Sequence, residues 1–187
     1  MESLRSEGCA FDTVSISSEA ARGGNLKMLQ WLRNQYPPCP WNSGVCSEAA
    51  KRGDLEMLQW ARNQNPPCPW DGWVSKSAAE RGDLAMLQWA RSQNPPCPWD
   101  AWVCYHAAER GHIAMLRWAR NQVPPCPWTE WVCYLAARRG DLEMLQWARR
   151  NGCPWDKEIC LQEAEGHSQV REWIRYNNSG DFFSEPE

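Results

Sequence analysis

The chain has 187 residues, a formal net charge of −3 and 43% hydrophobic residues. This balance fits one soluble folded unit and excludes a strongly basic chain that binds nucleic acid through overall charge. No apolar run is long enough to span a bilayer, and residues 1–8 lack the apolar core of a signal peptide. We therefore expect a protein of the cytoplasm or nucleus with no membrane contact.

A repeated segment organises the sequence from residue 9 onward. The triplet Cys-Pro-Trp returns every 29 residues, beginning at Cys39, Cys68, Cys97 and Cys126. Self-similarity with a fixed period of this size predicts stacked repeats. In chain order we expect an N-terminal tail at 1–8, a single array at 9–175 and a flexible acidic tail at 176–187, with repeats at 9–38, 39–67, 68–96, 97–125, 126–152 and 153–175.

Each repeat is predicted to contain two short helices. In the fourth repeat, Asp100 is placed to cap the first helix and Gly111 to end it. The second helix is expected from Ile113 to about Gln122, because two prolines follow and cannot continue it. Neither helix is long enough to be stable alone, so the repeats must stack. The corresponding caps of the first helices are expected at Asp71, Thr129 and Asp156.

The turn between the two helices carries the most specific pattern in the sequence. Residues 78–87 read AAERGDLAML, and residues 136–145 read AARRGDLEML. This pattern resembles the core of the ankyrin repeat, Ala-Ala-x-x-Gly-His-Leu-Glu-Val-Val, and His112 supplies the family's histidine in one copy. The resemblance implies an all-α, ankyrin-like α-solenoid of about six stacked helix-turn-helix units that binds a partner protein through a concave face lined by first helices.

Two departures from the ankyrin pattern change this expectation. The family's Thr-Pro-Leu-His segment falls on residues 102–105, which read Trp-Val-Cys-Tyr. The step of 29 residues is also shorter than the usual 33, and the missing residues fall in the connection that forms the family's β-hairpin fingers. We therefore expect these fingers to be largely absent.

Positions that differ between otherwise similar first helices are the candidate binding residues. One varying column holds Ser, Lys, Tyr and Tyr, and the next holds Glu, Ser, His and Leu. Aromatic and arginine side chains concentrate binding energy at interfaces. We expect a monomer that contacts an unidentified partner protein through Lys76, Trp102, Tyr105, His106, Arg110, Trp131, Tyr134, Leu135, Arg138 and Arg139.

The cysteines and histidines do not form a recognisable metal or catalytic motif. Within a repeat the cysteines are seven residues apart, as in Cys97 and Cys104, and Ser75 takes the place of the thiol seven residues after Cys68. That spacing differs from the two to four residues of a zinc knuckle. We expect buried, reduced thiols, no metal, no cofactor and no enzymatic activity.

Two alternatives to protein binding remain open at this point. Ladders of arginine at the helix ends could follow the phosphates of a nucleic acid, although the acidic overall charge speaks against this. The near identity of the repeats also fits a recently duplicated array that has no selected partner.

Overall fold

The computed structural model describes residues 13–177, and within that range the chain forms twelve helices and no strand. The helices fall in two compact units, Met1–Pro98 and Trp99–Glu187. The expected tail at 1–8, the beginning of the first repeat at 9–12 and residues 178–187 of the expected acidic tail lie outside the described residues.

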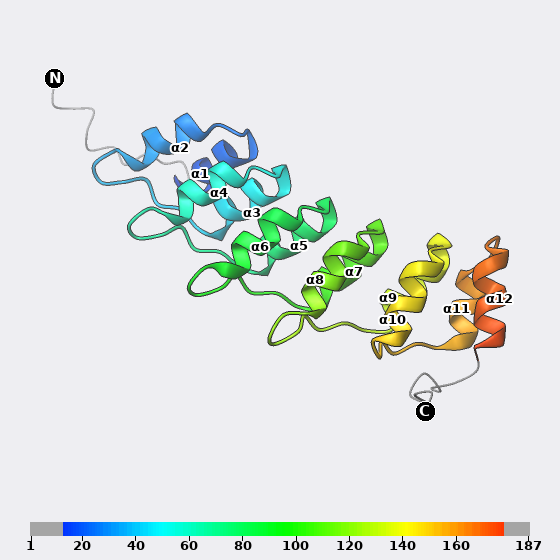
Figure 1. The fold of residues 1–187 in the computed structure, drawn as a ribbon. Helices are drawn as coiled ribbons and strands as arrows, with labels where there is room; N and C mark the ends of the chain where they lie inside the picture. Colours follow the sequence, from blue (N-terminus) through cyan, green and yellow to red (C-terminus); the bar gives the residue numbers. More distant parts are fainter. Residues whose placement is uncertain (1–12, 178–187) are drawn as a thin grey trace, which may run out of the picture. The chain divides into compact units, whose positions relative to one another are not determined.

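Each unit contains three consecutive helix pairs (Figure 1). The helices of the first unit are α1 (Thr13–Arg22), α2 (Leu26–Arg33), α3 (Ser43–Arg52), α4 (Leu55–Arg62), α5 (Gly72–Arg81) and α6 (Leu84–Ser92). Those of the second unit are α7 (Ala101–Arg110), α8 (Ile113–Arg120), α9 (Trp131–Arg139), α10 (Leu142–Arg150), α11 (Lys157–Glu163) and α12 (Ser168–Tyr176).

The helices pack in the same way in both units. The first helix of every pair contacts the helix that follows it, as in α3 with α4 and α9 with α10. First helices also pack on one another, so that α3 contacts α1 and α5, and α9 contacts α7 and α11. The described chain is therefore an all-α helical repeat, as the 29-residue step predicts.

Short polar side chains and glycines set the ends of the helices. The Asp100 side chain accepts a hydrogen bond of 3.0 Å from the backbone N–H of Trp102, which satisfies a donor in the first turn of α7. Gly111 follows α7 with a φ of 81°, a left-handed conformation that a residue with a Cβ adopts only at a cost. The same side-chain cap is present at Asp71 and Asp156.

Two expected helix ends are wrong. Thr129 does not cap α9, because Glu130 already has helical φ and ψ angles and the helix begins at Trp131 without a side-chain cap. The second helix of the fourth repeat ends at Arg120 rather than near Gln122. Its end is closed by the Gln122 side chain, whose Nε2 donates a 3.0 Å hydrogen bond to the carbonyl oxygen of Trp118.

The core is built from small and medium-sized residues that recur in every repeat. In the second unit, Val103, Cys104 and Ala107 of α7 and Met115 and Leu116 of α8 are all buried. The second-helix tryptophans lie on the apolar side of their helices, a position that predicts burial in the core, but Trp60, Trp89 and Trp118 are only half-buried. They lie at its edge, where each contacts another tryptophan.

Candidate functional site

The Cys-Pro-Trp motif fastens the proline-rich loop to the second helix that precedes it. Arg120, near the end of α8, donates from Nη1 to the carbonyl oxygen of Cys126 at 2.6 Å. Its guanidinium also lies 4.2 Å from the ring centroid of Trp128, a cation–π contact. Equivalent pairs of contacts join Arg33 to Cys39 and Trp41, Arg62 to Cys68 and Trp70, and Arg149 to Cys153 and Trp155.

The same tryptophans also pack on the second-helix tryptophan of their own repeat. Trp128 meets Trp147 of α10 edge-on, with ring centroids 5.6 Å apart. Trp41 and Trp60 are 5.8 Å apart in the same T-shaped arrangement. Tryptophan recurs at three positions of the repeat: in the Cys-Pro-Trp motif, in the second helix and at the start of the first helix. The tryptophans of the first two positions contact one another in these pairs.

The thiols pair between repeats rather than within them. The Cys46 thiol donates to the backbone carbonyl oxygen of Cys68, 22 residues later, at 3.9 Å. The Cys104 thiol donates in the same way to the carbonyl oxygen of Cys126 at 4.0 Å, and Ser75 donates from Oγ to Sγ of Cys97 at 3.4 Å. Side chains 22 residues apart meet because stacking brings the first helix of one repeat against the loop that leads into the next. All nine cysteines among residues 13–177 are buried, and none of these nine forms a disulfide.

Burial and thiol pairing raise the pKa of several of these cysteines. For Cys46, Cys126 and Cys133 the interaction with a neighbouring cysteine side chain, that of Cys68, Cys104 and Cys153 respectively, is the first cause and burial the second. Burial is the first cause for Cys97 and for Cys160, whose pKa rises to about 12. A thiol of raised pKa stays protonated and is a poor nucleophile and a poor metal ligand near neutral pH.

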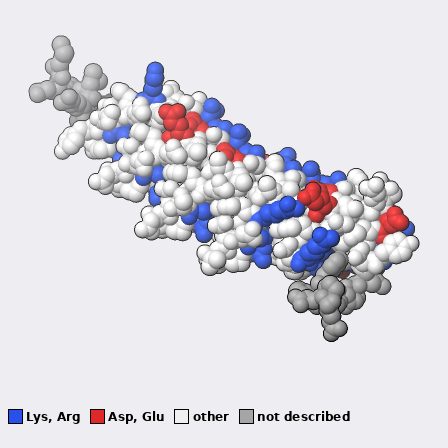
Figure 2. All heavy atoms as spheres, in the orientation of Figure 1, with Lys and Arg blue, Asp and Glu red and all other residues white. Residues whose placement is uncertain are grey.

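The arginines at the ends of the first helices are also engaged. Arg52, Arg81 and Arg139 each donate from Nη1 to a backbone carbonyl of the preceding repeat, at 3.1, 3.3 and 3.0 Å. These guanidiniums are partly committed to holding repeats together. Uncharged side chains, moreover, cover most of the face of the molecule drawn in Figure 2.

One group of aromatic side chains is left facing outward in the second unit. Trp102 and Tyr105 of α7 and Trp131 and Tyr134 of α9 form an unbroken run of edge-on ring contacts, which we call the aromatic ridge. Successive ring centroids are 5.1, 6.3 and 5.5 Å apart. The two indoles are each 52% exposed. Helical spacing of three residues places each tyrosine beside its tryptophan, and the packing of α7 on α9 joins the two pairs.

A cavity of about 300 Å³ opens beside this ridge. It is lined by Trp102, Tyr105 and Trp131 together with Ala101 and Thr129. Its walls are therefore mainly aromatic rings, and Tyr105 and Thr129 are the lining residues that carry a hydroxyl. A concave apolar surface with few polar groups is typical of a site that receives a side chain of a partner or a small ligand.

Carboxylates lie next to the ridge. The pKa of the Tyr134 phenol is raised, first by partial burial and then by the negative charges of Glu130 and Asp156. Glu109 accepts a hydrogen bond from Nδ1 of His106 at 3.1 Å, beneath the ring of Trp102. The surroundings of the ridge are thus aromatic and acidic.

The structure brings together only part of the predicted binding set. Leu135 is 3% exposed and His106 is 8% exposed. Both face the packed interior of the stack, so neither offers surface to a partner, and the expectation for these two residues is corrected. Arg110, Arg138 and Arg139 are exposed, but they lie at the opposite end of the first helices from the two indoles. Lys76 belongs to the first unit, where its ammonium lies over Trp73.

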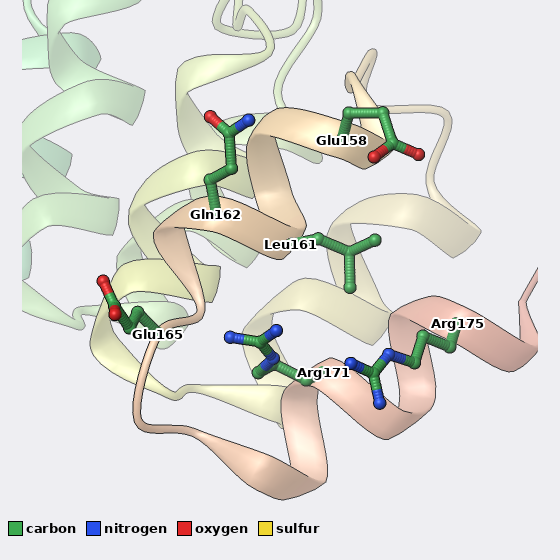
Figure 3. Close-up of a pocket in the computed structure, with 6 residues that line it drawn as sticks. All are labelled: Glu158, Leu161, Gln162, Glu165, Arg171 and Arg175. Carbon is green, nitrogen blue, oxygen red and sulfur yellow. The ribbon is translucent and has the colours of Figure 1, made fainter.

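A larger cavity lies between the last two helices, with a volume of about 410 Å³ (Figure 3). Glu158, Leu161 and Gln162 of α11 line it together with Arg171 and Arg175 of α12. Carboxylates and guanidiniums face the same open space, so the cavity has no single charge preference. Charged residues at this end fit the polar outer face that a terminal repeat requires.

Two further features of the described residues limit the site. No group of three or more His, Cys, Asp and Glu side chains among residues 13–177 is placed to hold a metal ion. None of the helices within this range is long and apolar enough to cross a bilayer.

No known protein-family model matches the chain, and no curated protein matches it significantly.

Proposed function

We propose that this chain is an ankyrin-like repeat protein, without enzymatic activity or cofactor, that binds another protein through the aromatic ridge. The observation that supports this proposal most strongly is the contrast between aromatic columns. From Trp41 onward the Cys-Pro-Trp and second-helix tryptophans pack on one another, whereas the ridge exposes half of each indole beside a cavity. Exposed aromatic clusters of this kind are typical of interaction surfaces.

The ankyrin-like assignment rests on the sequence of the turn and on the arrangement of the helices. Each Ala-Ala-x-x-Gly turn joins two short antiparallel helices, and first helices pack against first helices. Between the pairs, residues 13–177 contain irregular loops and no strand, which fits a repeat whose hairpin fingers are lost. Cytoplasmic or nuclear localisation is part of the proposal, since the buried cysteines are free thiols although several of them contact one another.

The test is affinity capture from a cell lysate with a matched pair of variants. Tyr105→Ala with Tyr134→Ala removes the two phenols of the ridge but leaves the buried core unchanged. Tyr176→Ala removes an equally large side chain that is 81% exposed on α12, away from the ridge. We expect the double variant to weaken binding of a captured protein by about 2 kcal/mol or more, and Tyr176→Ala to bind like the unchanged protein.

Helicity and the melting temperature show whether the double variant is folded. We expect both to equal those of the unchanged protein. Normal binding by a folded double variant, or loss of its fold, would contradict the assignment of the ridge. Salt-dependent binding of generic DNA or RNA that survives in the double variant would instead support the arginine ladders.

A further inference from the structure

The tryptophan that opens a first helix has a different environment in each unit. In the first unit, Trp73 is 52% exposed, and the ammonium of Lys76 lies 4.2 Å from its ring centroid. The ammonium of Lys51 lies 6.0 Å from the same ring. An ammonium at this distance from an indole face is attracted by the negative potential of the ring. The tryptophan that opens the first helix therefore already binds a lysine ammonium in one repeat, that of Lys76 on Trp73.

In the second unit, aromatic rings take the place of these lysines. Trp131 has the same 52% exposure, and its ring neighbours are Tyr134 at 5.5 Å and Tyr105 at 6.3 Å. Tyr134 stands three residues after Trp131, as Lys76 stands three residues after Trp73. The indole is therefore bordered by phenol rings where the earlier repeat supplies an ammonium.

The charge of the residue 22 positions before this tryptophan is also reversed. Lys51 precedes Trp73 by 22 residues, and the residue that precedes Trp131 by 22 is Glu109. A carboxylate thus replaces a lysine in the same register of the repeat. Glu130 and Asp156 lie near enough to Tyr134 for their negative charges to contribute to its raised pKa. An aromatic wall with carboxylates nearby favours a cation over a neutral or an acidic group.

We infer that the cavity beside Trp131 binds the ammonium group of a lysine side chain supplied by a basic segment of the partner protein. This inference rests on the proposed function and specifies the chemistry of the partner. The cavity of about 300 Å³ has room for the methylene stem of a lysine between Trp102, Tyr105 and Trp131. The stem packs on the rings and the ammonium faces the indole of Trp131, as Lys76 does on Trp73.

The experiment uses the full chain and the indole N–H signals of its tryptophans in nuclear magnetic resonance spectra. One probe is the peptide acetyl-Gly-Lys-Gly-amide, and the control probe has norleucine in place of lysine, which keeps the stem but removes the charge. The signals of the two ridge tryptophans are assigned from the spectra of Trp102→Phe and Trp131→Phe. The signal of Trp73, whose ring already has ammonium neighbours, serves as an internal reference and is assigned from Trp73→Phe.

We expect the lysine peptide to shift the Trp131 signal in a saturable way, with a dissociation constant in the range of about 1–30 mM. The norleucine peptide should bind at least about fivefold more weakly, which is the ratio expected for one exposed cation–π contact and its neighbouring carboxylates. Trp73 should respond less than Trp131 to the lysine peptide.

A single substitution provides the matched variant. Tyr134→Lys introduces into α9 the residue that α5 carries at the same position, so its fold should be retained, and the new ammonium should occupy the ring of Trp131. We expect it to weaken binding of the lysine peptide by about fivefold or more, whereas Tyr134→Phe should change binding by less than about twofold.

Equal affinity for the lysine and norleucine peptides would overturn the inference and leave an apolar site. Absence of a saturable shift at Trp131 below about 50 mM lysine peptide would also overturn it. Neither result would refute the proposed function, because capture of a partner that depends on Tyr105 and Tyr134 is measured separately.

Discussion

Arg139 donates a hydrogen bond from Nη1 to the backbone carbonyl oxygen of Glu109, thirty residues earlier in the chain, at 3.0 Å. The same guanidinium occupies the space beside Gly111, where an added Cβ would lie 2.5 Å from Nη2. The bond satisfies a carbonyl near the C-terminus of α7 that has no partner within the helix. Arg52, Arg81 and Arg139 in this column each bind a first helix to the end of the preceding one, in addition to any effect on the helix dipole.

Gly111→Ala is expected to destabilise the protein for two separable reasons. A φ of 81° costs a residue with a Cβ about 1 kcal/mol, and the new methyl group must displace Arg139. We expect a total loss of about 2 kcal/mol in the free energy of unfolding, measured by urea denaturation.

Gly152→Ala provides the control for the backbone contribution. Gly152 has a φ of 77°, and nothing lies within 4 Å of its added Cβ. It should lose only about 1 kcal/mol. If the two substitutions cost the same, the contact of Arg139 with Gly111 contributes nothing to stability.

Arg120→Lys should loosen the loop that carries the Cys-Pro-Trp motif. Lysine lacks the planar fork that allows Arg120 to donate to the Cys126 carbonyl and to stack on Trp128 at the same time. We expect a loss of about 1–2 kcal/mol in the free energy of unfolding. Arg138→Lys, at an exposed position, should cost less than about 0.5 kcal/mol, and an equal cost for both would refute the proposed role of Arg120.

The buried thiols make stability depend on alkaline pH. The folded protein raises the pKa of Cys46, Cys97, Cys126, Cys133 and Cys160, whereas in the unfolded chain a thiol titrates near about 8.5. Below that value both states are protonated, so these thiols cause no change in stability. Above it the unfolded chain loses protons first, and the free energy of unfolding should fall by roughly 1 kcal/mol per such thiol per pH unit.

Urea denaturation under reducing conditions at a series of pH values from neutral to alkaline measures this fall. The slope should be smaller in Cys46→Ser, because one of the affected thiols is absent. A free energy of unfolding that does not change across this range would show that the thiols ionise equally well in the folded protein.

Cys104→Ser is expected to be tolerated although the side chain is fully buried. The preceding repeat carries Ser75 at this position, where Oγ donates to the Pro98 carbonyl at 2.8 Å and contacts Cys97. We expect the free energy of unfolding to change by less than about 1 kcal/mol, because Pro127 offers the new hydroxyl the carbonyl that Pro98 offers Ser75. Val103→Ser, one residue away and 1% exposed, should cost about 3 kcal/mol. A similar loss in both variants would contradict the equivalence of the two repeats.

The sequence by itself determined the elements that depend on local chemistry. The 29-residue step, the Asp caps and the glycine turns predict two helices per repeat, and twelve helices occupy the described residues. Helix ends depend on the backbone within a few residues, so they can be deduced from short motifs. The two wrong helix ends also have local causes. Glu130 has helical φ and ψ angles, which moves the start of α9, and the Gln122 side chain caps the end of α8.

Only the tertiary structure decided which side chains form contacts between repeats and which stay exposed. In the sequence the cysteines of one repeat are seven residues apart, but stacking brings together cysteines that are 22 residues apart. His106 and Leu135 vary between repeats like a surface column, yet the neighbouring helices bury them, whereas Trp131 beside them stays half exposed. A repeat period specifies what recurs along the chain, but burial depends on the rotation of each helix against its neighbours. That rotation is set by the packing of whole side chains, which no single repeat contains.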